Sequence, residues 1–314
     1  MITKEWHKEA LSLRDKGFSG RAIANIIGKS KSQVNEFLKN SIYTWSEDVV
    51  EELSSSIIPD GPKVLVYDIE TAPMLSYCWG LWDQNIGLNQ IHTDWHLLSW
   101  AAKWLHSDDI FYEDQRNAEN IEDDYAILLG IWKLLDEADF VITQNGKKFD
   151  QKKLNARFVF HGMKPPSSYR HIDVLLIAKA QFGFSSNKLA FMTDKFCTKY
   201  KKSTHAKFHG FELWRECLAK NEEAFDEMMD YNCLDILSLQ ELFEILAPWD
   251  TKLPVFEVYK EEVVENDEWV KSGYVYSNAG KYDRYRNTKT GQQRRGKVNL
   301  LSKDKRQSLL SNIV

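Results

Sequence analysis

Four acidic side chains and one tyrosine stand at positions in this 314-residue sequence where they could do chemistry together. The first two acids, Asp68 and Glu70, come at the end of a short apolar segment. As residues i and i+2 of a strand they would point to the same side, and two carboxylates so close repel each other unless a cation lies between them. A solvated strand end would also explain the pair, so by itself it is a weak sign of a metal site.

The other acids belong to two further local patterns. Gly146 would allow a tight turn after a short apolar strand, and Asp150 would then open a helix, where the helix dipole favours an anion. Tyr231 and Asp235 are residues i and i+4 of a long predicted helix, so they share one face of it. Each pattern also has an ordinary explanation: a helix-capping aspartate in the first case, and a boundary pair on a surface helix in the second.

In their order along the chain the three patterns are far more specific. Asp68-Ile-Glu70, Asn145-Gly-Lys-Lys-Phe-Asp150 and Tyr231-Asn-Cys-Leu-Asp235 resemble the three motifs of the DEDD superfamily of 3′–5′ exonucleases, which has a ribonuclease-H-like fold. Because its third motif has a tyrosine, the sequence resembles the DEDDy branch of this superfamily. The resemblance covers about residues 63–248, and it looks like a subgroup found in phages and bacteria. One position departs from that subgroup: Gln144 stands where a histidine is expected, and it can donate a hydrogen bond but cannot carry a charge.

The resemblance implies metal-dependent hydrolysis of phosphodiester bonds. Two divalent ions about 3.5–4 Å apart can stabilise both the attacking and the leaving oxygen, and carboxylates suit Mg²⁺ and Mn²⁺ as ligands. By the family's pattern the first acid bridges both ions, and the metal ligands are Asp68, Glu70, Asp150 and Asp235. Tyr231 would position the attacking water rather than act as a free base, because an unperturbed phenol keeps its proton up to about pH 10.

The resemblance also implies which residues meet the substrate. Thr71, Asn145 and Phe149 would hold the terminal nucleotide through hydrogen bonds and ring contact. Asp173 is a further acid in a suggestive stretch, and we interpret it as structural or supporting. The expected catalytic set is Asp68, Glu70, Asp150, Tyr231 and Asp235.

Alternating strand and helix patterns must position these residues. Apolar runs predict strands at 63–67, ending at Asp68, and at 97–105 and 140–143. Apolar periodicity predicts helices at 120–137, 173–182, 186–197 and 222–246. The buried faces of the first and last of these helices are expected to be Ile121, Tyr125, Leu128, Leu129, Trp132 and Leu135, and Phe225, Met229, Ile236, Leu239 and Phe243. This succession indicates an α/β domain over 63–250, which the resemblance specifies as a ribonuclease-H-like mixed five-stranded sheet with flanking helices.

The first 42 residues predict a small all-α domain. Helices are expected at 3–16, 19–27 and 33–40, the last of them capped by Ser32. This arrangement resembles the helix-turn-helix of resolvases and transposases, although a three-helix protein-interaction module would look the same. The residues that would meet phosphates and base edges of DNA are Lys29, Lys31, Gln33 and Asn35. Residues 43–62 predict a linker.

Residues 251–314 form a basic, tyrosine-rich C-terminal segment. The segment resembles a zinc ribbon, but Asn287 and Thr290 stand where a cysteine pair is expected and no cysteine follows Cys233. We therefore expect a zinc-free remnant, with a disordered basic tail as the alternative. The arginines that would bind nucleic acid here are Arg284, Arg286, Arg294 and Arg295.

Charge is unevenly distributed around the net value of −5. Residues 1–40 hold 8 Lys and Arg against 4 Asp and Glu, and residues 271–314 hold 11 against 2. The remaining residues, 41–270, hold 22 against 40. Basic ends around an acidic middle would suit a protein that binds a polyanion at its flanks and cations at its centre.

Composition excludes several other classes of protein. The four cysteines are scattered, so neither a disulfide scaffold nor a thiolate zinc site is expected. No apolar run approaches the ~20 residues of a membrane-spanning helix, and no signal-peptide core follows Met1. We expect a cytoplasmic protein of a bacterium or a phage-infected cell, with no membrane partner.

The function that the residues and the resemblance favour is that of a metal-dependent 3′–5′ exonuclease. It would hydrolyse phosphodiester bonds at single-stranded 3′ ends of DNA, release nucleoside 5′-monophosphates and use two Mg²⁺ or Mn²⁺ ions and no zinc. Two alternatives stay open: an RNA 3′–5′ exonuclease, and a DNA-binding regulator or scaffold whose nuclease fold is catalytically silent.

Overall fold

The computed structural model describes residues 6, 10, 13, 20–30, 33–34, 61–105, 107–200, 207–256, 268–277 and 279–310. The chain divides into two units, Met1–Asp60 and Gly61–Val314. Within the described part of the chain, no helix combines the length and the apolar character needed to cross a membrane.

The N-terminal unit contains the helix expected at 19–27, which is observed as α2 (Gly20–Ile27). Ser30 makes a capping box with Gln33: the Gln33 N–H donates to Ser30 Oγ at 3.2 Å, and the Ser30 N–H donates to Gln33 Oε1 at 3.3 Å. The cap therefore lies two residues before the expected Ser32.

Only part of the predicted DNA-binding surface of this unit is described. Lys29 and Gln33 are exposed. Lys31 and Asn35 lie outside the described residues, as do most of the helices expected at 3–16 and 33–40. The helix-turn-helix assignment stays a prediction.

A mixed five-stranded sheet organises the second unit, with strand order β5-β4-β1-β6-β7. The strands are β1 (Val64–Thr71), β4 (Leu97–Trp104), β5 (Ile110–Asp114), β6 (Phe140–Thr143) and β7 (Arg170–Asp173). β1 pairs in parallel with β6, and β6 with β7, whereas β4 is antiparallel to both β1 and β5. The carboxyl ends of β1, β6 and β7 therefore lie at the same edge of the sheet.

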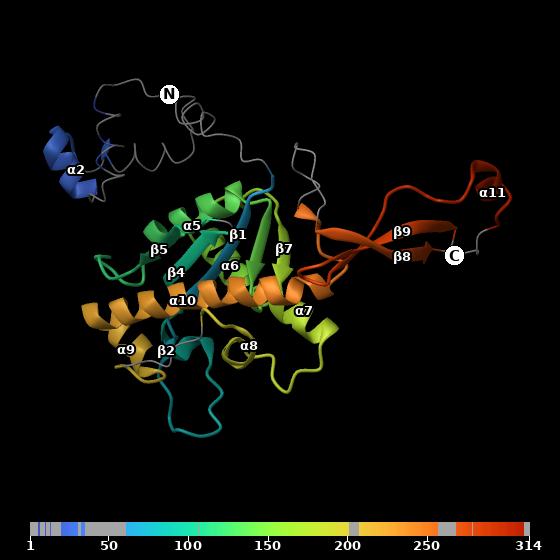
Figure 1. Cartoon of the computed structure of the whole chain (residues 1–314). Coiled ribbons are helices and arrows are strands. Elements are labelled where there is room, and N and C mark those ends of the chain that lie inside the picture. Colours follow the sequence, from blue (N-terminus) through green and yellow to red (C-terminus); the bar gives the residue numbers. More distant parts are fainter. Residues whose placement is uncertain are drawn as a thin grey trace. The chain divides into compact units, whose positions relative to one another are not determined.

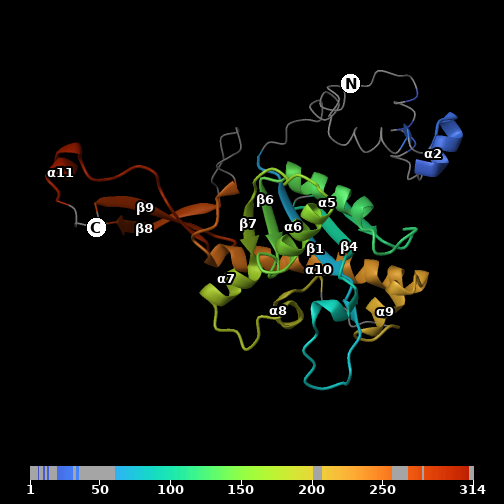
Figure 2. The ribbon, with the colours of Figure 1, turned by 180° about the vertical axis from the view of Figure 1, so that it is seen from behind.

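Helices cover both faces of this sheet, so the predicted α/β architecture is confirmed (Figures 1 and 2). The helices are α5 (Tyr125–Glu137), α6 (Asp150–Phe160), α7 (Val174–Gln181), α8 (Leu189–Phe196), α9 (Glu212–Leu218) and α10 (Glu222–Leu246). α5 and α6 pack on one face, and α7, α8 and α10 pack on the other. A small hairpin of β2 (Leu75–Ser76) and β3 (Ile91–Thr93), with a 3-10 helix at Leu88–Gln90, lies between β1 and β4 in the chain, and a second 3-10 helix, Ala247–Trp249, follows α10.

The alternation of side chains along β1 explains how the two cores form. Val64 and Val66 pack against α10 residues such as Leu239, while Leu65 and Tyr67 pack against α5 and α6. Because the side-chain period of a strand is two residues, positions 68 and 70 continue the face that looks toward α10.

Several predicted boundaries are wrong. β1 continues to Thr71 instead of ending at Asp68, because β4 pairs with it as far as that residue. The helix expected at 120–137 begins at Tyr125. Its buried face holds Ile127 and Ile131 in place of the expected Tyr125, Leu129 and Trp132, which are only partly buried. In α10 the buried methionine is Met228, while the expected Met229 is 37% exposed.

The C-terminal segment folds into a separate sheet rather than the disordered tail considered as an alternative. Its antiparallel strands are β8 (Trp269–Ser277), β9 (Gly280–Asn287) and β10 (Gln293–Arg295), and α11 (Lys303–Gln307) follows. Asn287 Oδ1 accepts from the N–H groups of Lys289 and Thr290, both at 2.9 Å, so hydrogen bonds close this turn. The relation of this sheet to a zinc ribbon stays a prediction.

Candidate active site

One pocket of the second unit gathers most of the residues that the sequence singled out. The residues that line it are Asp68, Ile69, Glu70, Gln144, Asn145, Phe149, Asp150, Leu189, Tyr231 and Asp235. They come from β1, from the segment between β6 and α6, from the first residue of α6, from α8 and from α10. All five residues of the expected catalytic set are among them, together with two of the three expected substrate-binding residues. Thr71, the third, is not among the lining residues.

Asp68 and Glu70 reach the pocket because they lie on the face of β1 that looks toward α10. The strand does not end before them, as Asp68 pairs with Ala101 of β4 and Glu70 pairs with Ser99. The two carboxylates therefore project from a hydrogen-bonded backbone, which fixes their direction better than a free strand end would.

Asn232, a residue that the sequence reasoning missed, holds Asp68 in place. Its Nδ2 donates to Asp68 Oδ2 at 2.8 Å, and its Oδ1 accepts from Ser99 Oγ at 3.3 Å. Asn232 is fully buried on α10. The signal for it was a polar residue within the apolar stripe of that helix, between Met228 and Ile236, where a core would not place an amide without a partner.

Asp150 enters the pocket from the opposite layer of the fold. It is the first residue of α6, and its Oδ1 accepts the N–H of Ile69 at 3.2 Å. Burial raises the pKa of Asp150 to about 7, and the negative charge of Asp173 adds to the rise. A cation beside this carboxylate would favour its ionised form and oppose that rise.

The turn before α6 is shaped by Asp173 and by two unusual backbone positions. Asn145 adopts a left-handed conformation with φ 65°, which asparagine tolerates better than most residues. Gly146 packs so closely on Thr143 that a Cβ would lie 2.2 Å from its Oγ1. Asp173 accepts the N–H of Asn145 at 2.9 Å and that of Lys147 at 3.3 Å, and it also caps α7. These contacts agree with the supporting role expected for Asp173.

His171 fixes the strand end that leads into this turn. Its Nε2 lies 2.7 Å from Thr143 Oγ1, and its Nδ1 lies 3.2 Å from Gln151 Oε1. Burial lowers the pKa of His171 to about 4, so the ring is neutral at physiological pH. A neutral ring with its proton on Nδ1 donates to Gln151 and accepts from the Thr143 hydroxyl, which satisfies both contacts.

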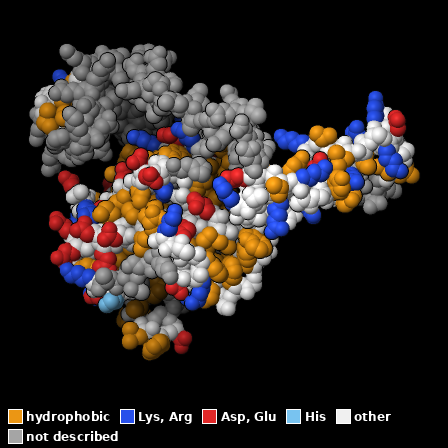
Figure 3. Space-filling model, viewed as in Figure 1, with side chains coloured by type: hydrophobic (Ala, Val, Ile, Leu, Met, Phe, Trp, Pro, Cys, Tyr) orange, Lys and Arg blue, Asp and Glu red, His pale blue; other side chains and the backbone are white. Residues whose placement is uncertain are grey.

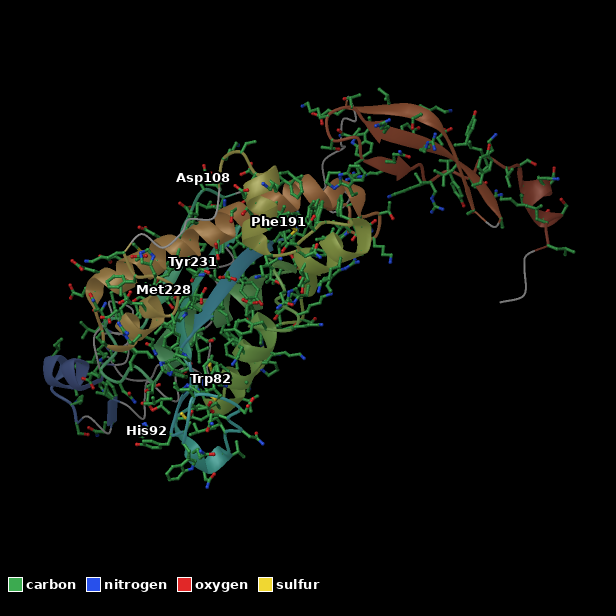
Figure 4. The ribbon with its side chains drawn as sticks, turned by 90° about the horizontal axis from the view of Figure 1, so that it is seen from below. Trp82, His92, Asp108, Phe191, Met228 and Tyr231 are labelled. Atoms are coloured by element: carbon green, nitrogen blue, oxygen red, sulfur yellow. The ribbon has the colours of Figure 1, made fainter. Side chains whose placement is uncertain are left out.

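Tyr231 comes from the middle of α10 (Figure 4). Asp235 follows it by four residues on the same helix, and both line the pocket, as expected from their spacing. Asp235 is 5% exposed, and the ring of Tyr231 packs edge-on against Trp214 of α9, with ring centroids 6.1 Å apart. Trp214 thus supports the ring of the tyrosine from a neighbouring helix.

The donor set of the pocket suits hard divalent cations. Four carboxylates line it, with no imidazole or thiolate among the lining residues, and such oxygen ligands fit Mg²⁺ or Mn²⁺. Across the residues that the structure describes, however, no group of three or more His, Cys, Asp or Glu side chains is already arranged to hold a metal ion. The four carboxylates therefore share a pocket without closing around a common point.

The predicted nucleic-acid-binding arginines of the C-terminal segment lie on β9 and β10. Lys and Arg side chains are spread along this sheet (Figure 3). Arg294 lies over the Trp269 ring at 4.5 Å and Arg295 over the Tyr282 ring at 4.2 Å. Arg286 is exposed, whereas Arg284 donates two hydrogen bonds to the carbonyl of Ser272.

Comparison with known proteins gives one family and a weak structural likeness. The RNase_H superfamily model matches residues 87–247, about half of the chain; this range includes Asp150, Tyr231 and Asp235 but begins after Asp68 and Glu70. No curated protein matches the chain. Among solved structures, the family B DNA polymerase from the hyperthermophilic archaeon Pyrobaculum calidifontis is similar at 17% identity and a TM-score of 0.44, over 62% of this chain and 26% of the polymerase chain. The matched region spans about a quarter of that polymerase.

Proposed function

The chain belongs to the RNase H superfamily, and from this premise we propose that it is a metal-dependent 3′–5′ exonuclease. Its substrate would be DNA with a single-stranded 3′ end, and its products nucleoside 5′-monophosphates. The observation that carries the proposal is the pocket itself, which is lined by Asp68, Glu70, Asp150 and Asp235 together with Tyr231 although the four acids come from three separate elements.

The proposed cofactor is a pair of Mg²⁺ or Mn²⁺ ions held by these four carboxylates. Such ions would stabilise negative charge on the attacking and leaving oxygens of the phosphodiester. The chain's own contribution is to hold its carboxylates ready: Asn232 orients Asp68, and the Ile69 N–H orients Asp150. Each hydrogen bond to a charged oxygen also limits the rotation of that side chain.

The remaining residues of the pocket would position the two reactants. Tyr231, supported by Trp214, would orient the attacking water through its hydroxyl. Asn145, at the tip of the turn, and Phe149, 39% exposed at the rim of the pocket, would hold the terminal sugar and base. Asp173 keeps Asn145 in place through the backbone hydrogen bond.

DNA is proposed as the polymer because the basic N-terminal segment resembles a DNA-binding helix-turn-helix. The choice of polymer does not depend on the hydrolytic chemistry of the pocket. An RNA exonuclease would use the same pocket, and a silent scaffold would bind DNA without cleaving it.

The test is cleavage of a 5′-labelled single-stranded oligonucleotide with Mg²⁺ or Mn²⁺. We expect a ladder that shortens from the 3′ end, together with nucleoside 5′-monophosphates, and we expect Asp68→Asn and Asp235→Asn to abolish both. Asp230→Asn is the matched control, because Asp230 is an exposed acid on the same helix as Asp235. Equal cleavage by the wild type and both pocket variants would overturn the proposal. Faster cleavage of an RNA oligonucleotide than of the DNA oligonucleotide would identify RNA as the substrate.

A further inference from the structure

A row of two aromatic rings and one ammonium group leads away from the rim of the pocket. Phe149 lines the pocket, and Lys153 follows it by one helical turn on the same face of α6. Lys153 Nζ lies 5.8 Å from the centroid of the Phe149 ring and 3.6 Å from that of the Trp95 ring. The ammonium therefore stands between a ring that belongs to the pocket and a ring that lies beyond it.

Lys153 is in a different electrostatic situation from Arg157, the next basic residue along this side of α6. Both nitrogen–oxygen contacts of the Arg157 guanidinium to Asp124 are 2.7 Å, and both of these side chains are buried. The charge of Arg157 is thereby neutralised, and its role is structural. The rings beside Lys153 carry no formal charge, and the charge of the nearby Asp94 acts on its ammonium without an ion pair among the described residues. The ammonium can therefore still bind an anion.

Arg157 also explains why Trp95 keeps its position. The guanidinium carbon lies 5.8 Å from the centroid of the Trp95 ring, and Asp94 Oδ1 accepts the N–H of Trp95 at 2.8 Å. Asp124, which binds Arg157, accepts the N–H of Leu97 two residues after Trp95. The tryptophan is thus held between a fixed guanidinium and a fixed backbone, so little conformational entropy would be lost when a ligand stacks on it.

The charge of the surrounding segment fits an anionic ligand. Residues 147–153 contain four lysines and one acid, and that acid is the buried Asp150. Residues 41–270 as a whole hold 22 basic against 40 acidic residues, so a basic cluster beside the acidic pocket is a local exception. Lys147, Lys148 and Lys152 are exposed and add to this potential.

Rings that alternate with a cation at the mouth of a pocket suit a single-stranded polynucleotide. Bases stack on aromatic side chains, and an ammonium between the rings can meet the phosphate that joins two nucleotides. A duplex would not offer its bases to these rings, because they are stacked and paired inside the helix.

We propose that Trp95 and Lys153 form a binding site for the nucleotides that precede the 3′-terminal one in a single strand whose end lies in the pocket. This proposal rests on the proposed function and adds to it the path that the substrate strand takes outside the pocket. Lys153 would bind the phosphate between the second and third nucleotides from the end, and Trp95 would stack on one of their bases.

The kinetic test compares two substrates of different length. The p-nitrophenyl ester of thymidine 5′-monophosphate reaches only the pocket, whereas an oligo(dT) strand extends beyond it. We expect Lys153→Ala and Trp95→Ala to raise the KM for the oligonucleotide about tenfold and to leave hydrolysis of the ester within twofold of the wild type. Lys153→Arg should restore part of the loss, because it keeps the charge.

The matched control is Lys179→Ala. Lys179 is an exposed lysine of α7, which packs on the other face of the sheet from α6. We expect this variant to behave as the wild type with both substrates. If Lys153→Ala leaves the KM for the oligonucleotide unchanged, or lowers hydrolysis of both substrates equally, the proposed path is wrong.

A second measurement does not depend on hydrolysis. An oligo(dT) strand with 5-iodouracil at the second position from its 3′ end is bound to the full chain in the presence of EDTA, and the complex is irradiated. The peptide that becomes cross-linked to the strand is then identified by mass spectrometry. We expect the cross-link at Trp95, and its loss in Trp95→Ala. A cross-link confined to other segments would overturn the site, while a cross-link at Trp95 in a protein that cleaves neither substrate would retain the site and reject the nuclease proposal.

Discussion

Replacement of Asn232 by leucine should lower catalysis without weakening the contact with the rest of the substrate strand. The variant keeps the approximate size of the side chain but removes the amide that donates to Asp68 Oδ2 at 2.8 Å and accepts from Ser99. A hydrogen bond to a charged group contributes about 1.5–3 kcal/mol. If that energy serves to orient Asp68 for the reaction, its loss lowers kcat/KM about 10- to 150-fold.

The assay for this variant is hydrolysis of the p-nitrophenyl ester and of a labelled oligonucleotide over a range of Mn²⁺ concentrations. We expect the loss with both substrates, a higher Mn²⁺ requirement, and an unchanged KM for the oligonucleotide. Gln240→Met is the matched control: Gln240 lies two turns further along α10, its Nε2 donates to Glu244 of the same helix, and it does not line the pocket. Activity of Asn232→Leu within threefold of the wild type, with a normal denaturation curve, would refute the positioning role of Asn232.

Three further predictions concern stability and binding. Burial raises the pKa of Glu113 from 4.5 to about 7, so between these pH values the folded state keeps a proton that the unfolded chain releases, and the free energy of unfolding falls as the pH rises from 4.5 to 7. In urea denaturation, Glu113→Gln should therefore be more stable than the wild type at pH 8 and equally stable near pH 4.5. An equal difference in stability at both pH values would contradict this. Gly146→Ala should cost about 1–3 kcal/mol of unfolding free energy, and lower activity, because its Cβ would overlap the Thr143 side chain; unchanged denaturation and activity would show that the turn adapts. Replacing Arg294 and Arg295 by alanine should reduce the slope of log affinity against log salt for single-stranded DNA by about 0.7 per lost phosphate contact, and an unaltered slope would exclude them from binding.

The sequence predicted the interior of the fold better than its edges. β6 and α10 were predicted with the bounds observed, because an uninterrupted apolar run and a long apolar stripe are strong local signals. Of the five strands of the main sheet, the two that were not predicted, β5 and β7, are its edge strands. β5 has no fully buried residue, and β7 is four residues long with one charged residue at each end, so neither shows a strand pattern on its own. α9, seven residues long, was missed for the same reason.

The candidate site could be predicted as a set of residues but not as an arrangement. Motif order named the acids and Tyr231, and all of them line the pocket. The hydrogen bond between Asn232 and Asp68 joins residues 164 positions apart, and no local pattern encodes such a contact. A buried asparagine on an apolar helix face indicates that a partner exists, but only the fold shows which residue it is.

The pocket follows from strand direction and strand period together. β1, β6 and β7 run in parallel, so the end of β1 with Asp68 and Glu70, the turn after β6 with Asn145, and the end of β7 with Asp173 meet at one edge of the sheet. Ligands in open α/β sheets bind at such carboxyl ends, where backbone groups are free of the ladder. The period of two directs Asp68 and Glu70 to the α10 face and the Ile69 side chain to the core on the opposite face, while the Ile69 N–H donates to Asp150. A shift of one residue in the register of β1 would exchange the two faces, placing Ile69 against Asp235 and both carboxylates in the apolar core beneath α5. The same alternation that divides the core into two halves therefore also selects which side chains of β1 can take part in chemistry.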